Sequence, residues 1–133
     1  MLSQELCQKV LAAAASTGAD YAEIYEEYTV NHTIHMIASR VDAVKDTVIA
    51  GVGIRVCKGL RSVNTSTVDT SEAGLIRCAR QAADALGQGS ACLDICLKPM
   101  VYADAHPVKQ YPVEADNARK VEILKEGYFA AKE

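Results

Sequence analysis

The sequence predicts an α+β fold: an antiparallel meander of four to five strands, with an N-terminal helix and two further helices packed on the sheet. Residues 47–57 alternate between apolar and other side chains with a period of two, which is typical of a strand with one buried face. Lys58-Gly59 follows, where glycine supplies the positive φ of a tight hairpin turn, and residues 60–67 return as a partner strand. Apolar residues recur at helical spacing on both sides of this hairpin, in residues 4–17 and 69–86.

The strand at residues 47–57 is the centre of the predicted sheet. Gly51 and Gly53 lie on the face opposite its apolar row, so that face has no side chains at its middle. Such a surface suits the close approach of another backbone, and it equally suits a bend in the sheet. The apolar row comprises Val48, Ala50, Val52, Ile54 and Val56.

The first half of the chain predicts a helix followed by short strands. Residues 4–17 form the helix, with Ser3 as its N-cap and Gly18 as its C-cap. Residues 21–30 form a strand that ends in a turn at Asn31-His32. Next comes a short strand carrying Ile34 and Met36, which ends at a turn at Ser39-Arg40. A strand at 41–44 follows, and Lys45-Asp46 then precedes the central strand.

The second half predicts two helices separated by an irregular region. The second helix starts at the capping-box spacing of Asp69 and Glu72 and is closed by Gly87. Residues 87–112 contain one short strand at 100–102. The third helix starts at Glu114, and its apolar stripe reaches the end of the chain, so we expect residues 1–133 to be a single, incomplete domain. That stripe comprises Val121, Leu124, Tyr128 and Ala131.

Composition excludes several classes of function. The 133 residues carry a net charge of −3 and no run of three basic residues, which argues against nucleic acid or an anionic membrane as a partner. The N-terminus lacks a basic leader, and no apolar run is long enough to span a bilayer. We therefore expect a cytoplasmic protein whose five cysteines are reduced thiols.

No motif in the chain predicts a catalytic, cofactor-binding or metal-binding residue. His32 and His35 are three apart where the flanking pattern is strand and turn, and residues three apart on an extended strand point to opposite faces. Cys92 and Cys96 have no second pair to complete four ligands. Glu23 and Glu27 share a strand face, which could hold a cation but is more typical of a solvated surface.

The order of the motifs resembles the amino-terminal domain of the TldD/PmbA family, whose members are often labelled modulators of DNA gyrase. The resemblance rests on three features in sequence: Gly18-Ala19-Asp20-Tyr21-Ala22-Glu23, then Gly51-Val52-Gly53-Ile54-Arg55-Val56, and the hairpin leading into the second helix. Tyr102-Ala103-Asp104, Pro107-Val108 and the segment 119–125 are similar to the TldD branch.

The resemblance implies a dimeric zinc metallopeptidase that degrades peptides or unfolded polypeptides. The family carries its zinc on an H-E-x-x-x-H helix, and this chain has no His-Glu dipeptide. We therefore expect zinc only in the full-length family protein and no activity from this chain alone. Its role would be to help assemble a dimer with a family subunit and to wall the substrate cleft. The alternative is a stand-alone, non-enzymatic module that binds a protein or self-associates.

The sequence also predicts where a peptide or a partner subunit would make contact. Strand edges can hold an extended peptide by adding it to the sheet. The bare glycine face and the polar strand after Gly59 are the parts of the hairpin that suit such a contact. The predicted contact residues are Gly51, Gly53, Arg55, Asn64 and Thr65.

Overall fold

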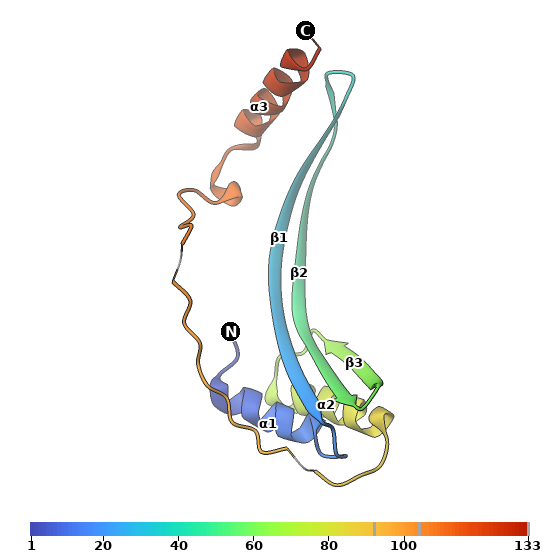
Figure 1. Cartoon of the computed structure of the whole chain (residues 1–133). Coiled ribbons are helices and arrows are strands. Elements are labelled where there is room, and N and C mark those ends of the chain that lie inside the picture. Colours follow the sequence, from blue (N-terminus) through green and yellow to red (C-terminus); the bar gives the residue numbers. More distant parts are fainter. Residues whose placement is uncertain (92, 104, 133) are drawn as a thin grey trace. The chain divides into compact units, whose positions relative to one another are not determined.

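A computed structural model describes residues 1–91, 93–103 and 105–132 of the chain (Figure 1). It divides into two compact units, which we describe separately. The core unit comprises Met1–Tyr28 and Ile49–Met100, and the hairpin unit comprises Thr29–Val48 and Val101–Glu133. The elements in chain order are α1 (Gln4–Ala14), β1 (Tyr21–Ile37), β2 (Arg40–Lys58), β3 (Arg61–Thr67), α2 (Glu72–Leu86), the 3-10 turn η1 (Pro112–Glu114) and α3 (Asn117–Ala130).

The three strands form one sheet in the order β1-β2-β3. The predicted α+β class is confirmed, but the predicted four to five strands are wrong, because the sheet in the described part of the chain has three. β1 runs through Asn31-His32 and β2 runs through Lys45-Asp46, so neither polar pair forms a turn. Instead, His32 Nδ1 lies 2.7 Å from Asp46 Oδ1 and links the two strands.

The tight turn between β1 and β2 lies at Ala38-Ser39, one residue before the predicted position. Both residues have positive φ, at 47° for Ala38 and 63° for Ser39. Positive φ at both central residues is the pattern of a type I′ turn, whose twist matches that of the flanking strands. This geometry lets two strands of 17 and 19 residues continue as one hairpin.

Helix α1 begins where the sequence predicts and ends earlier. The Ser3 hydroxyl accepts a hydrogen bond from the N–H of Leu6 at 3.2 Å, so the predicted N-cap is confirmed. The helix ends at Ala14, whereas the prediction extended it to residue 17. Gly18, with φ of 86°, lies in the turn that follows rather than at the cap.

Helix α2 is capped by Ser71 rather than by Asp69. The Ser71 hydroxyl accepts a hydrogen bond from the N–H of Gly74 at 3.1 Å. Asp69 accepts one from the N–H of Ser71 at 3.1 Å and pairs with Arg77 at 3.2 Å. A side chain at position 74 would overlap the Asp69 carboxylate, which explains a glycine in the first turn. Gly87 closes the helix, as predicted.

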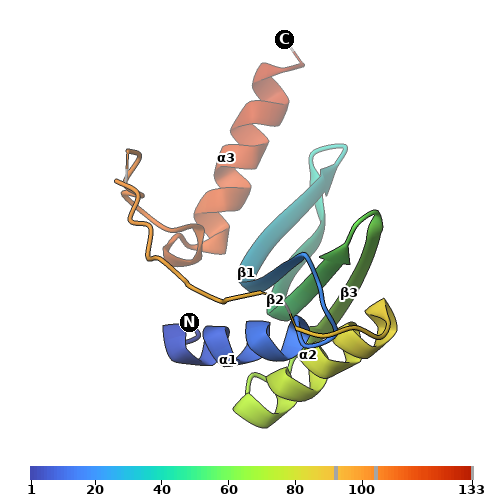
Figure 2. The ribbon, with the colours of Figure 1, turned by 60° about the horizontal axis from the view of Figure 1, so that its bottom comes forward.

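The core lies between the two helices and one face of the sheet (Figure 2). Three residues of the predicted apolar row are buried there, whereas Val48 and Ala50 are exposed. The buried cluster is Val10, Ala14, Ala15, Ala19, Val52, Ile54, Val56, Leu75, Cys78, Ala79, Ala82 and Leu86. Small side chains on α1 and α2 allow these helices to pack closely against each other.

The hairpin unit has no buried residue among those that the structure describes. Its helix α3 is capped by Asp116, which accepts a hydrogen bond from the N–H of Ala118 at 3.1 Å. The predicted third helix therefore exists, but it begins at Asn117 rather than at Glu114, and none of its residues is buried. The short strand predicted at residues 100–102 is wrong: these residues belong to no strand or helix. The predictions that involve Cys92, Asp104 and Glu133 lie outside the described residues.

Candidate functional site

The sheet of the core unit has one face turned away from α1 and α2, which we call the open face. Ala22 and Ile24 of β1 pack against the core, so the residues of β1 that alternate with them point the other way. The strand register sets Gly53 opposite Ser66, Arg55 opposite Asn64 and Cys57 opposite Ser62. The open face thus consists of Tyr21, Glu23, Tyr25 and Glu27 on β1, Gly51, Gly53, Arg55 and Cys57 on β2, and Ser62, Asn64 and Ser66 on β3.

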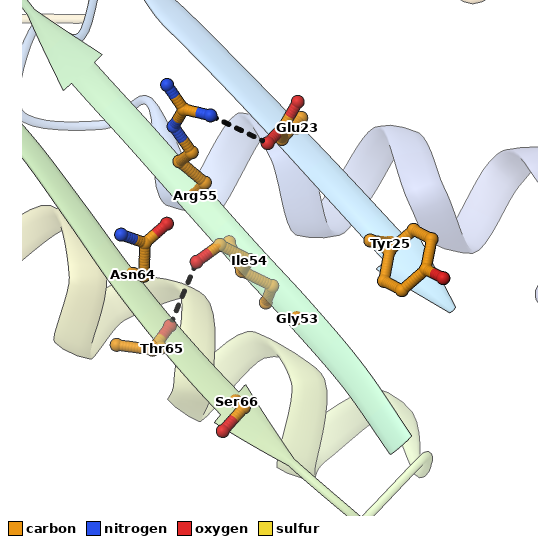
Figure 3. Close-up of a pocket in the computed structure, with 8 residues that line it drawn as sticks. All are labelled: Glu23, Tyr25, Gly53, Ile54, Arg55, Asn64, Thr65 and Ser66. Atoms are coloured by element: carbon orange, nitrogen blue, oxygen red, sulfur yellow. Dashed lines mark hydrogen bonds and ion pairs between the residues drawn. The ribbon is translucent and has the colours of Figure 1, made fainter. Parts of the chain in front are cut away.

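A polar hollow of about 390 Å³ lies on the open face (Figure 3). Glu23 from β1 points toward Arg55 from β2, and Arg55 Nη1 lies 3.5 Å from Glu23 Oε1. Asn64 lies beside Arg55 on the next strand. The lining residues are Glu23, Tyr25, Gly53, Ile54, Arg55, Asn64, Thr65 and Ser66.

Hydrogen bonds extend this pair across all three strands. The Tyr21 hydroxyl donates to Glu23 Oε2 at 2.6 Å, and this bond raises the pKa of Tyr21. Arg55 Nε donates to Ser62 Oγ at 3.3 Å. The Cys57 side chain first, and the Glu23 carboxylate less strongly, raise the pKa of Arg55, so the guanidinium stays charged. Both oxygens of Glu23 therefore have a donor.

An apolar hollow of about 410 Å³ adjoins the polar one. The two share Tyr25, Gly53 and Ser66, so they form one continuous depression, which we call the trough. The backbone of Gly51 and Gly53 forms its floor. A Cβ on Gly53 would have only the Tyr25 carbonyl oxygen near it, at 4.0 Å, whereas one on Gly51 would lie 3.1 Å from the Thr67 carbonyl oxygen. The apolar hollow is lined by Tyr25, Glu27, Ile49, Ala50, Gly51, Val52, Gly53, Ser66, Thr67 and Val68.

The structure brings four of the five predicted contact residues together on the open face. Gly53, Arg55 and Asn64 line the polar hollow, and Gly51 lines the apolar one. Thr65 differs, because its register partner is the buried Ile54 and its hydroxyl donates to the carbonyl of Cys78 on α2 at 3.3 Å. The Thr65 side chain thus faces the core, although the residue is among those that line the polar hollow.

Four residues that line the polar hollow are not among the predicted contact residues, namely Glu23, Tyr25, Ile54 and Ser66. The signal for three of them was present in two patterns. Period-two alternation sets Glu23 and Tyr25 opposite the apolar residues of β1. A two-residue loop joins β2 and β3, so counting the same number of residues back from the turn on each strand sets Ser66 opposite Gly53.

Strand β3 forms one edge of the sheet. In the described part of the chain it pairs only with β2. In an antiparallel ladder alternate residues direct their backbone N–H and C=O groups to each side. The outer side of β3 therefore offers backbone groups that no other strand of the described chain engages, directly beside the trough.

The described residues do not fit a metal site. No group of three or more His, Cys, Asp or Glu side chains among them could hold an ion. His32 and His35 lie on one strand three residues apart, so they point to opposite faces. The described helices also include none with the length and apolar character that crossing a bilayer requires.

A third hollow lies within the hairpin unit. It has a volume of about 600 Å³ and separates the tip of the hairpin from α3. Its lining is mainly apolar, with a lysine and a histidine at the rim. The lining residues are Ile34, His35, Met36, Lys120, Ile123, Leu124, Gly127 and Tyr128.

Comparison with known proteins assigns the central part of the chain to a family. The family model described as PmbA/TldA metallopeptidase domain 1 matches residues 22–86, from the second residue of β1 to the last residue of α2. No curated protein matches the chain. The matched segment carries the whole trough, together with β3 and the helix α2 that supports it. Residues 22–86 therefore belong to the amino-terminal domain of the TldD/PmbA family.

Proposed function

We propose that the chain is the non-catalytic amino-terminal portion of a TldD-like zinc metallopeptidase that degrades peptides or unfolded polypeptides. In this role the open face and the outer edge of β3 wall the cleft that admits extended substrates, and the domain takes part in dimer assembly. The family match supports the peptidase context. Zinc and the reaction itself would belong to the full-length protein, as the family resemblance implies.

The observation that carries the proposal is the trough lying next to an unengaged strand edge. An extended peptide has backbone donors and acceptors on both sides, so it can hydrogen-bond to β3 as a further strand. Its alternate side chains then stand on the open face, where Gly51 and Gly53 leave room for them. Backbone pairing of this kind tolerates many sequences, which suits a peptidase that takes unfolded polypeptides.

The test is a titration of the isotope-labelled chain with an unlabelled extended peptide, followed by amide NMR. We expect the amide signals of β3 and of residues 51–57 to shift, and those of α3 to stay unchanged. A matched control is the same peptide with alternate backbone nitrogens methylated, which removes the donors needed for strand pairing. Unshifted β3 amides with the unmodified peptide would contradict the edge-binding role.

A second candidate function is self-association through α3, as expected of a stand-alone binding module. Ile123 and Phe129 on this helix are about half exposed, and no residue of α3 is buried. A helix with an uncovered apolar face gains stability when a partner covers it. Sedimentation over a concentration series tests this idea. A Phe129→Glu variant should be monomeric, whereas a control Lys125→Glu variant should associate like the natural chain. A natural chain that stays monomeric at all concentrations would contradict self-association through α3.

A further inference from the structure

The trough has one high wall and one low wall. On the β1 side, the large side chain of Tyr25 borders the glycine floor and is 62% exposed. On the β3 side the register partner of Gly53 is only Ser66. The low side is also the side with the unengaged edge. A strand added to β3 would thus supply the second wall from its own side chains.

The distance from the outer edge of β3 to the glycine floor determines how long a peptide side chain must be to reach that floor. Neighbouring strands lie about 4.8 Å apart, so an added strand would be roughly two spacings from β2. Only a long side chain opposite Ser66 can cross β3 and reach the backbone of Gly53. An aromatic ring fits best, because it buries a large area and would meet Tyr25 on the far side of the trough.

The polar hollow has an excess of hydrogen-bond donors. Arg55 uses Nη1 and Nε for Glu23 and Ser62, and its side chain also interacts with Cys57, but a guanidinium has more N–H donors than these partners engage. The side-chain amide of Asn64 also makes no hydrogen bond to a described residue, and Asn64 lies opposite Arg55 in the register. Both oxygens of Glu23 already have donors. A ligand group that accepts hydrogen bonds therefore suits this end better than one that donates them.

The two ends of the trough have the spacing of alternate residues in a strand. Asn64 and Ser66 are two residues apart on β3, so an added strand places two residues of the same face beside them, about 7 Å apart. We propose that the trough recognises an extended peptide carrying an aromatic residue over Gly53 and a glutamate, two positions away, at Arg55 and Asn64. This inference rests on the proposed edge-binding function and adds a substrate preference to it.

The experiment measures fluorescence anisotropy of labelled decapeptides mixed with the 133-residue chain. The peptides share one Ser/Thr-rich framework and differ at a central tripeptide, which is Phe-Ser-Glu, Phe-Ser-Lys or Ala-Ser-Glu. We expect Phe-Ser-Glu to bind about fivefold more tightly than Phe-Ser-Lys, a modest ratio because Arg55 is half exposed. Phe-Ser-Glu should also bind more tightly than Ala-Ser-Glu.

Two variants assign these preferences to the trough. Arg55→Gln should abolish the difference between the Glu and Lys peptides, whereas a Lys45→Gln control, the same charge change in the hairpin unit, should leave it unchanged. Gly53→Val should weaken the Phe peptides selectively, because its side chain fills the floor, and its Cβ would have the Tyr25 carbonyl oxygen as its nearest neighbour, at 4.0 Å.

The outcomes separate this inference from the proposed function. If all three peptides bind equally and shift the β3 amides, edge binding stands and the preference is wrong. If the Lys peptide binds best, or if Arg55→Gln retains the Glu preference, the assignment of the carboxylate to Arg55 is overturned. If none of the peptides shifts the β3 amides, both proposals fail.

Discussion

Alanine substitutions at the two floor glycines should change stability in opposite directions. Neither Gly51 nor Gly53 has positive φ, so alanine fits both backbones. At Gly53 the added Cβ has open space, with the nearest atom, the Tyr25 carbonyl oxygen, at 4.0 Å. At Gly51 it would lie 3.1 Å from the carbonyl oxygen of Thr67, a residue fixed by pairing with Val52.

The magnitudes follow from these two contacts. Gly→Ala at a compatible position stabilises a protein by about 0.4–1 kcal/mol, chiefly because the unfolded chain loses conformational freedom. We expect that gain for Gly53→Ala. Gly51→Ala gains the same entropy term, but overpacking against a fixed backbone atom costs about 1–3 kcal/mol. The two variants should therefore differ by at least about 1 kcal/mol in the free energy of unfolding.

Urea denaturation followed by far-UV circular dichroism measures this difference. With a slope of about 2 kcal/mol per molar urea, the two midpoints should be separated by roughly 0.5 M or more, with Gly53→Ala the higher. The natural chain should lie between them. A Gly53→Ala midpoint at or below that of Gly51→Ala would refute the reasoning, because it would mean that the open face at Gly53 is already covered.

Three further substitutions test the core unit. Ile54→Ala should lower the free energy of unfolding by about 2–5 kcal/mol in the same assay, because it opens a cavity in the buried cluster, whereas exposed Val44→Ala should change it by under about 1 kcal/mol. Ser71→Ala should cost about 1 kcal/mol through loss of the α2 N-cap, with Ser66→Ala as the neutral control. Hydrogen bonds from Ser71 hold the pKa of Asp69 below its ordinary value, so Asp69 stabilises the fold above its unfolded pKa and loses this effect as the pH falls through its folded pKa. Asp69→Asn should therefore flatten the acid limb of a stability–pH profile, and an unchanged limb would contradict that role.

The strand count shows how composition can mislead. Asn31-His32 and Lys45-Asp46 have the residue types of turns, yet both pairs lie inside long strands. Their polarity is compatible with a strand because His32 Nδ1 and Asp46 Oδ1 are bonded to each other across the hairpin. The true turn at Ala38-Ser39 has neither Gly nor Asn, so the sequence placed it one residue too late, at Ser39-Arg40, and the pairing of the two strands fixes its positive φ.

The candidate site was predictable to the extent that it depends on parity and register. The bare face at Gly51 and Gly53 follows from alternation alone, and the structure places both residues in the trough. Thr65 was assigned to the site because it is polar, whereas its register with Ile54 sets its side chain against α2. The extent of the buried row could not be read from the sequence, because Val48 is as apolar as Val52, yet Val48 is exposed whereas Val52 is buried in the core cluster.

An unengaged strand edge is also a hazard for the protein that carries it. Any β-prone segment can add to the outer side of β3, including the same strand of another copy, and repeated addition leads to aggregation. Strand β3 limits this risk by being only seven residues long and by alternating polar Ser62, Asn64 and Ser66 along the face that would pack against another sheet. The polar composition that suits this edge to the proposed peptide site thus also opposes polymerisation of the chain through it.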